Sequence, residues 1–515
     1  MRDVSTQLLV GGRIYAPDAT AMAVTDGVVV WIGQDSVGHA LHPDAEVIEL
    51  DGAFVAPAFV DAHVHATSAG LLLTGLDLTK TSSADELLQQ VRAAEGPLVW
   101  GHGWDETRWP ENRPPTRAEI DDAAQGKTVY LSRIDVHSAL VSSDLVTDEA
   151  RTADGFSDDG PLSRAAHHHV RGTAKAAITP EQRQAAQLAF LRYAASQGIA
   201  SVHECAGPDI SGEDDLRELL THAEGPEVVA YWGGHDLPDV TVRGLAGDHF
   251  VDGALGSRTA ALTEPYADAA TSGALYLDAR QIADHLVKCT ELGVQAGFHV
   301  IGDAAMAAVV EGFAIAEKVL GTPELASARH RLEHVEMVTK EQAEKLAGWG
   351  VVASVQPLFD AEWGGPTGMY AQRLGAERGV GLNPFSRLAA AGVVLAFGSD
   401  TPVTAIDPWA AVKAAVHHRT DGHGVSPRAA FTAHTRGGWR AAGVNDGLTG
   451  TLQPGAPATY AVWETGDLVV AGSDARVQRW STDPRSGVPG LPDLTGPAPV
   501  CVRTVLNGRT IYERK

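Results

Sequence analysis

The sequence is poor in cysteine and in long apolar runs. Its 515 residues include only 3 Cys, too few for a disulfide scaffold of this length. No uninterrupted apolar run approaches the roughly 20 residues that span a bilayer, so we expect no membrane partner. The first residues, MRDVSTQLLVGG, also lack the apolar stretch and the small-residue cleavage pattern of a signal peptide. Together with reduced thiols, these absences predict a cytoplasmic protein.

Positive charge is also scarce. Lys and Arg number 40 against 65 Asp and Glu, which gives a net charge of −25, and no basic run is present. Such a field repels phosphate backbones, so nucleic acid is not an expected partner. Histidine, by contrast, is abundant at 21 residues, and it predicts that any bound metal is held by imidazole and carboxylate groups.

The two ends of the chain share a pattern that the middle lacks. Asp26-Gly27 is a tight-turn signal between the apolar runs 21–25 and 28–32, and Asn507-Gly508 is the matching signal near the C-terminus. Chain ends usually lie close together on a domain surface. We therefore expect one small β-sandwich domain built from residues 1–56 and 447–515.

Residues 57–446 alternate short apolar runs with helical stretches, which is typical of repeated β/α units. The runs are AFVAPAFVDAHVH, GIASVHE, EVVAYWGG, DHFVDG, VQAGFHV, HRLEHVE, VVASVQP and VVLAFGSD, and helices are expected at 180–197, 281–292, 304–319 and 340–347. Eight such units predict an α/β fold with a TIM-type (β/α)₈ barrel. A segment at about 75–180, with strands of its own, is expected as a large insertion after the first barrel strand, on the face where barrel enzymes bind substrate.

A candidate metal site lies at the ends of the predicted barrel strands. His63 and His65 are two residues apart, and a strand points such residues to one side. Alone, His-x-His fits ordinary packing equally well. However, His299, His334 and Asp400 end three further runs, so five ligand-type residues are expected at one rim of the barrel.

These residues, with the longer motifs around them, resemble the amidohydrolase superfamily. The motifs are GHGWDETRWPENRPPTRAEID, DGALGSRTA, HVIGDAA, RLEHVE, ASVQP and FGSDTPV, and they are similar to the branch that contains N-substituted formamide deformylases and related metal-dependent hydrolases. The resemblance extends over nearly the whole chain. It implies that His63, His65, His299, His334 and Asp400 are metal-site residues.

One departure from the family concerns the fourth barrel strand. Many superfamily members carry a carboxylated Lys there that bridges two metals, but Asp248 stands at that place and no Lys is nearby. Either another carboxylate forms the bridge or the site holds one metal. Glu204, which ends the second barrel strand, is the preferred substitute, followed by Asp252 and then Cys205, and the alternative for Glu204 is a supporting or salt-bridged acid.

The ligand types suit Zn²⁺, one or two ions, with Mn²⁺ and Fe²⁺ as alternatives. The resemblance implies that a metal-bound hydroxide attacks the carbonyl of an N-acyl or N-formyl amine and cleaves a non-peptide C–N bond. Asp400 would move the proton, and His334 or His299 would act as ligand or as oxyanion donor. A deaminase, a cyclic amidase and a non-catalytic barrel scaffold stay open as alternatives.

Other residues are candidates for the small-molecule site. Arg258 follows the fourth run and could hold a substrate carboxylate or brace its own loop. Trp104 in the insertion fits a pocket or a core equally, and Gln356 could orient substrate or cap its strand. The run at 167–169 is expected to be solvent-facing, since three successive helical residues point in different directions. A homo-oligomer is left open.

Overall fold

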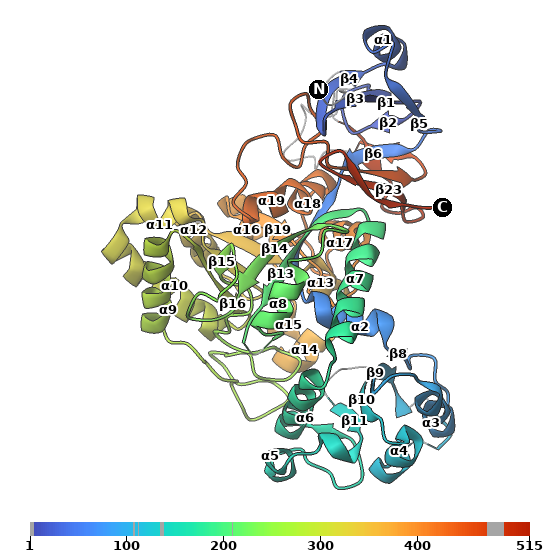
Figure 1. Ribbon diagram of the computed structural model, residues 1–515. Helices are drawn as coiled ribbons and strands as arrows, with labels where there is room; N and C mark the ends of the chain where they lie inside the picture. The colour runs from blue at the N-terminus through green and yellow to red at the C-terminus, as the bar shows by residue number, and fades with distance from the viewer. Residues whose placement is uncertain (1–4, 107–108, 112, 134–137, 209, 471–488) are drawn as a thin grey trace. The chain divides into compact units, whose positions relative to one another are not determined.

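The computed structural model describes residues 5–106, 109–111, 113–133, 138–208, 210–470 and 489–515 (Figure 1). The chain divides into two compact units, residues 1–65 with 191–515 and residues 66–190. In the part of the chain described, no helix has the length and apolar character needed to cross a bilayer.

A barrel of parallel strands forms the centre of the first unit. Its eight strands lie in the order β19-β18-β17-β16-β15-β14-β13-β7, and every pairing is parallel. They are β7 (Phe59–Val64), β13 (Ile199–Ala206), β14 (Glu227–Trp232), β15 (Gly244–Leu245), β16 (Gln295–Val300), β17 (Arg331–His334), β18 (Val352–Val355) and β19 (Val394–Phe397). Backbone N–H groups of Asp400 and His65 donate to the carbonyls of His63 and Thr401 at 2.8 and 2.9 Å and bring the two edges together. The predicted TIM-type barrel is therefore confirmed.

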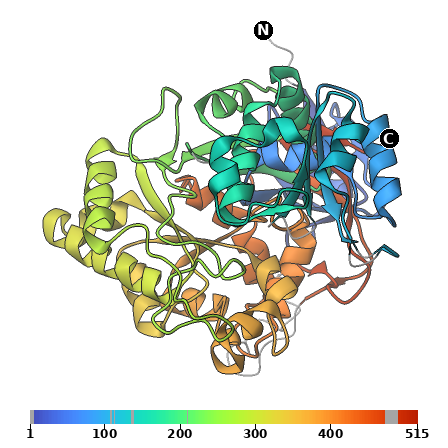
Figure 2. The same cartoon turned by 90° about the horizontal axis from the view of Figure 1, so that it is seen from below.

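The barrel strands are buried because helices cover their outer side. Figures 1 and 2 show α9 (Ala279–Leu292) and α10 (Asp303–Leu320), in yellow-green, outside the sheet. Helix α9 begins with a capping box between Asp278 and Gln281 and ends at Gly293 in the left-handed conformation. The other helices of this unit are α1 (Asp35–Leu41), α8 (Glu213–Leu219), α11 (Thr322–Ala328), α12 (Lys340–Gly348), α13 (Pro357–Trp363), α14 (Met369–Leu374), α15 (Ala376–Gly379), α16 (Phe385–Ala391), α17 (Pro408–Val416), α18 (Pro427–Ala433) and α19 (Arg436–Ala441).

The fourth barrel strand lies earlier than the sequence predicted. The expected run began at Asp248, whereas β15 ends at Leu245. Gly247 has a φ of +84°, which turns the chain out of the extended conformation, and a Cβ at this position would lie 2.9 Å from Cβ of Cys205. The following segment still contacts β16, because the N–H of His299 donates to His249 O at 3.0 Å.

Strands from both ends of the chain form two further sheets in this unit. One sheet has the order β4-β3-β1-β5, and the other, β2-β6-β20-β23-β24, combines N-terminal and C-terminal strands. They are β1 (Thr6–Val10), β2 (Arg13–Ile14), β3 (Ala21–Thr25), β4 (Val28–Gly33), β5 (Glu46–Glu49), β6 (Phe54–Pro57), β20 (Tyr460–Glu464), β23 (Val500–Leu506) and β24 (Arg509–Glu513), with a separate pair β21 (Leu468–Val469) and β22 (Leu491–Pro492). Apolar residues of both sheets share one buried cluster, and both predicted hairpins are present.

The second unit contains a sheet in the order β12-β11-β10-β9-β8. Its strands are β8 (Leu76–Asp77), β9 (Leu98–Trp104), β10 (Thr128–Arg133), β11 (Ser138–Val141) and β12 (Leu162–Ser163), and its helices are α2 (Ala66–Thr74), α3 (Ala84–Ala93), α4 (Arg117–Ala124), η2 (Ser143–Leu145), α5 (Asp148–Thr152) and α6 (Arg164–Ala176); α7 (Pro180–Ser196) leads into the first unit. One expectation is wrong here, since His167 is buried and lies 2.8 Å from the Tyr130 hydroxyl. The amphipathic period of α6 turns only one of the three histidines inward.

Candidate metal centre

The predicted ligand residues meet at the carboxyl end of the barrel. His63 lies in β7 and His65 follows it, His299 lies in β16, His334 ends β17, and Asp400 follows β19. Parallel strands deliver their C-terminal residues to one rim, which explains why positions far apart in the chain converge. The first unit contains all five.

Asp248 lies among the four histidines. Its Oδ1 is 3.5 Å from His63 Nε2, 3.4 Å from His299 Nδ1 and 3.7 Å from His334 Nε2, and its Oδ2 is 3.2 Å from His65 Nε2. Asp400 contacts the two histidines at the end of β7, with Oδ1 at 3.4 Å from His63 Nε2 and 3.2 Å from His65 Nε2. Sequence reasoning noticed Asp248 at the place of the missing Lys but did not choose it as the substitute.

Three of the imidazoles use their second nitrogen to contact a protein oxygen. His63 Nδ1 lies 2.9 Å from Glu333 Oε2, His334 Nδ1 lies 2.8 Å from Gln356 Oε1, and His299 Nε2 lies 3.4 Å from Gly253 O. Each of these oxygens accepts a hydrogen bond, so the proton of each neutral ring belongs on that nitrogen. The nitrogen that faces Asp248 is then left with its lone pair, as a metal ligand requires.

The atoms at the centre of the cluster fit a divalent cation. His63 Nε2, His299 Nδ1, Asp248 Oδ1 and Asp400 Oδ1 are buried and have no hydrogen-bond partner. Buried polar atoms normally find a partner, and orphaned ones call for an explanation such as an ion. Lone pairs of imidazole and carboxylate that converge from several strands are the donors that Zn²⁺, Mn²⁺ and Fe²⁺ accept.

The two carboxylates make the site favourable for positive charge. Burial acts to lower the pKa of His65, but Asp248 and Asp400 outweigh it and raise the pKa to about 9. Burial likewise acts to raise the pKa of Asp248, but His63 and the neighbouring imidazoles hold it well below its usual range. Asp248 is therefore ionised, and a cation at this position would compete with protons for the imidazoles.

A buried ion pair supports the site from inside the barrel. Arg331 Nε donates to Glu333 Oε1 at 2.5 Å, and its guanidinium lies 4.4 Å from the ring centroid of Tyr231. Its other contacts include the Nδ1 of His203 at 2.8 Å and Ser354 Oγ at 3.0 Å. Glu333 thus joins this network to His63. Sequence reasoning missed both charged residues, although the motif RLEHVE contains them.

The backbone is held in uncommon conformations where two of these residues lie. His334 and Asp400 have φ angles of +69° and +55°, a region that non-glycine residues seldom occupy. Gly398 permits the close approach that precedes Asp400, because a Cβ there would lie 2.5 Å from His63 N. Such strain is typical of functional sites, where the surrounding structure fixes a side-chain direction.

The structure does not bring Glu204 to the four histidines. Glu204 pairs across to Val64, the residue between His63 and His65, and paired residues on neighbouring strands point to the same side. Its neighbours His203 and Cys205 face the interior instead. His203 Nδ1 lies 2.8 Å from the Arg331 guanidinium, and Cys205 Sγ groups with ligand atoms of His63 and Glu333. Because the period of the strand is two, Glu204 as a ligand remains a prediction without support from this geometry.

Asp252, the next candidate, makes a different set of bonds. Its carboxylate accepts the backbone N–H groups of Ala261, Ile301 and Gly302 at 2.9, 3.0 and 2.7 Å. These bonds connect the loop after β15 with the segment after β16 and occupy the oxygens of the carboxylate. Asp252 therefore supports the rim of the barrel.

The expected substrate-binding residues lie in three different settings. Gln356 is buried beside His334, and its Nε2 has no hydrogen-bond partner. Arg258 forms two bonds with Asp268, at 3.0 and 2.7 Å. Trp104 is fully buried in the core of the 66–190 unit, where its Nε1 donates to Leu131 O at 2.8 Å. Of the three, Gln356 alone contacts one of the clustered histidines in the part of the chain described.

Comparison with known proteins agrees with this arrangement. The model of one amidohydrolase family matches residues 46–512, which is most of the sequence. The chain belongs to the amidohydrolase family. Membership, together with the barrel and the cluster of imidazoles and carboxylates, identifies it as a hydrolase of a metal-dependent kind.

Relatives within the amidohydrolases cover most of the chain at modest identity. A putative amidohydrolase, YtcJ, of Bacillus subtilis is 28% identical over 79% of this chain and 82% of its own. N-substituted formamide deformylase of Arthrobacter pascens is 23% identical over 80% of this chain and 84% of its own. The crystal structure of an uncharacterized metal-dependent hydrolase from Pyrococcus furiosus is 27% identical, covers 89% of this chain and 98% of its own, and superposes with a TM-score of 0.75.

Proposed function

We propose that this amidohydrolase cleaves a non-peptide C–N bond in a small N-acyl or N-formyl amine, with Zn²⁺ as its metal. The observation that carries the proposal is the set of buried, unpartnered ligand atoms around Asp248. The formamide deformylase among its relatives supports the N-formyl class, and the three buried, free cysteines are compatible with a cytoplasmic location.

Asp248 faces the proposed ligands through both of its oxygens. Oδ2 lies 3.2 Å from His65 Nε2, and Oδ1 lies 3.4 to 3.7 Å from nitrogens of His63, His299 and His334. We therefore assign to Asp248 the bridging role for which Glu204 was the sequence-based candidate. A carboxylate that uses both oxygens in this way could serve a site of two ions.

The residues supply distinct functions for hydrolysis. A divalent cation bound here would polarise a carbonyl oxygen and lower the pKa of a coordinated water toward about 7. Asp400 would accept a proton from the attacking water and pass it to the leaving nitrogen. The lone pair on His334 Nε2 fits a ligand better than an oxyanion donor, because its proton is engaged by Gln356. The buried, unpaired Nε2 of Gln356 would donate to a substrate oxygen.

The other two substrate-binding candidates have competing contacts. A substrate carboxylate would have to displace Asp268 from Arg258, since both of the bonds described involve that residue. Trp104 is buried in the core of the insertion, so it would affect substrate binding by stabilising that unit. We assign both a smaller role than Gln356.

We also propose the domain boundaries that the sequence indicates. Residues 1–56 and 447–515 would form the β-sandwich domain, and 57–446 the hydrolase barrel with an insertion at about 75–180. The sheet that combines strands of both ends supports the first part, and the compact unit of residues 66–190 supports the second.

The test measures metal content and hydrolysis together. The purified protein should contain stoichiometric Zn²⁺, and metal-depleted protein should regain hydrolysis of N-formyl and N-acyl amines on addition of Zn²⁺ or Mn²⁺. Cyclic ureas and aminated heterocycles in the same screen separate cyclic amidase and deaminase activity. His63→Ala should abolish every metal-dependent activity, whereas an unaltered protein with no bound metal and no gain from added metal would overturn the proposal.

A further inference from the structure

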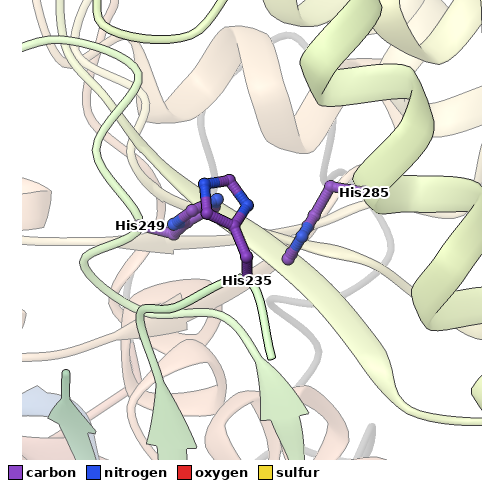
Figure 3. A group of neighbouring side chains, drawn as sticks. All are labelled: His235, His249 and His285. Atoms are coloured by element: carbon purple, nitrogen blue, oxygen red, sulfur yellow. The ribbon is translucent and has the colours of Figure 1, made fainter. Parts of the chain in front are cut away.

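Three histidines gather on the outer side of the barrel, away from the residues described above. His235 follows β14, His249 follows Asp248, and His285 lies in α9, so three separate segments supply them (Figure 3). One ligand atom from each lies within 4.8 Å of the other two. The ring centroid of His249 lies 4.6 Å from that of His235 and 4.7 Å from that of His285.

Hydrogen bonds to the backbone determine which nitrogens hold lone pairs. His285 Nε2 lies 2.9 Å from Leu245 O, so this nitrogen donates and Nδ1 retains its lone pair. His249 is hydrogen-bonded to the backbone of Gly233, while its Nε2 is buried and has no partner. The residue is only 6% exposed, so no bulk water satisfies that nitrogen. A buried nitrogen without a hydrogen-bond partner, beside two other imidazoles, is in the position expected of a metal ligand.

His235, the third histidine, is open to solvent and free to move toward the other two. His235 is exposed and follows the Gly233-Gly234 pair. A tetrahedral ion with Zn–N distances of about 2.0–2.1 Å places two ligand nitrogens roughly 3.4 Å apart. The ligand atoms now lie within 4.8 Å of one another, so they would have to approach by at most about 1.4 Å. His235 can make most of this movement because its side chain is in solvent. Lys288 is the nearby cation, and its Nζ is paired with Asp236 at 2.6 Å.

We propose that His235, His249 and His285 form a second metal site, which prefers Zn²⁺ over Ca²⁺ and Mg²⁺ and is separate from the centre at Asp248. Three imidazoles are typical ligands of Zn²⁺ and other late transition metals, whereas Ca²⁺ and Mg²⁺ require oxygen ligands that this site lacks among the described residues. Water would complete the coordination on the exposed side.

A cation at this site would fasten the segment after β15 to helix α9. His249 and Asp248 are adjacent, and their side chains lie on opposite sides of the backbone, one toward α9 and the other toward the barrel rim. A cation bound to His249 would therefore restrict the position of Asp248 without adding a contact within the centre at Asp248. Only this last consequence rests on the proposed function.

The test uses full-length protein in which the centre at Asp248 is disabled by removing all four of its imidazoles, through His63→Ala, His65→Ala, His299→Ala and His334→Ala. This background should bind one Zn²⁺ per chain in calorimetric titration and should show a higher melting temperature with Zn²⁺. Adding His235→Ala should weaken the affinity by 10- to 100-fold and remove the thermal shift, and because His235 is exposed this change should not impair folding. His249→Gln should have the same effect.

His39→Ala is the matched control, since His39 is an exposed histidine in helix α1. It should leave the titration unchanged. If the background protein binds no Zn²⁺, or binds it equally well after His235→Ala, the proposed site is wrong. Hydrolysis by the unaltered protein is measured separately, so the failure of one proposal is distinguishable from the failure of the other.

Discussion

Oδ1 of Asp248 lies 3.4 Å from Nδ1 of His299, and both atoms are buried without a hydrogen-bond partner. A buried carboxylate oxygen and a buried imidazole nitrogen this close, with no proton shared between them, are a pair of donors that a cation can bridge. The same carboxylate reaches His65 through its other oxygen. Asp248 therefore connects His65, which follows β7, with His299 in β16, and its loss should affect ligands from both places.

Asp248→Asn should lower bound metal to at most one ion per chain and reduce kcat by about 100-fold, because one negative oxygen is replaced by an amide that donates. Metal content and steady-state kinetics measure this. Asp252→Asn is the control, since Asp252 is also a buried aspartate but bonds to backbone N–H groups. It should lower the melting temperature and retain the metal. Equal metal loss in the two variants would contradict the assignment.

Gln356→Ala should weaken metal affinity by about 10–100-fold, because the residue fixes the ring orientation of His334 through a 2.8 Å contact. Competition with a chromogenic chelator measures the affinity. Gln295→Ala is the matched comparison, since Gln295 is equally buried but bonds to Tyr231 and to backbone carbonyls. We expect Gln295→Ala to reduce stability with metal affinity unchanged. An unaltered affinity in Gln356→Ala would remove Gln356 from the site.

Glu333 neutralises the buried Arg331 and also holds the His63 ring, and two sets of variants can separate these roles. Glu333→Gln leaves the buried Arg331 without its counter-ion, and we expect a loss of about 3–5 kcal/mol in the free energy of unfolding. Replacing both residues, as Arg331→Met with Glu333→Leu, removes the unpaired charge and should recover most of this stability.

Metal affinity should behave differently in the same variants. It should stay low in both, because His63 Nδ1 has lost its carboxylate acceptor in each case. Denaturant unfolding and chelator competition give the two quantities. Recovery of metal affinity along with stability would show that Glu333 acts on the site only through folding.

The sequence predicted the barrel and the positions of five clustered residues because strand period and strand-end position are local properties. His63 and His65 share a side of β7 for that reason, and Asp400 follows β19 at the same rim. The choice of Glu204 depended instead on which side of β13 faces the interior, and this is set by register with β7. Register is a property of two strands, so one strand alone could not reveal it.

The sequence did not identify Asp248 as a ligand for a different reason. The sequence placed it inside a strand, but Gly247 turns the backbone first and redirects the carboxylate toward the histidines. The sequence did not reveal the cluster of His235, His249 and His285 either, because two separate loops and a helix supply one residue each. Convergence of that kind depends on the packing of α9 against the barrel.

The last prediction concerns acid stability and His330. Its Nδ1 accepts the N–H of Ala296 at 3.0 Å, and its Nε2 lies 3.0 Å from the Thr290 hydroxyl, whose own proton is directed to Leu286 O at 2.7 Å. Burial lowers the pKa of His330 to about 3, and His285 adds to the effect. Protonation would place a second N–H against the backbone donor, so the folded protein keeps this ring neutral.

The unfolded chain binds the proton near the ordinary pKa of about 6.5, so its proton uptake exceeds that of the folded protein between pH 6.5 and about 3. The stabilising contribution is complete above pH 6.5 and is lost as the pH falls, at up to about 1.4 kcal/mol per pH unit. His330→Gln cannot titrate and should lose less stability than the unaltered protein between pH 7 and pH 5. Unfolding measured at both pH values, with saturating metal, tests this, and parallel losses in the two proteins would mean that His330 is not the titrating group.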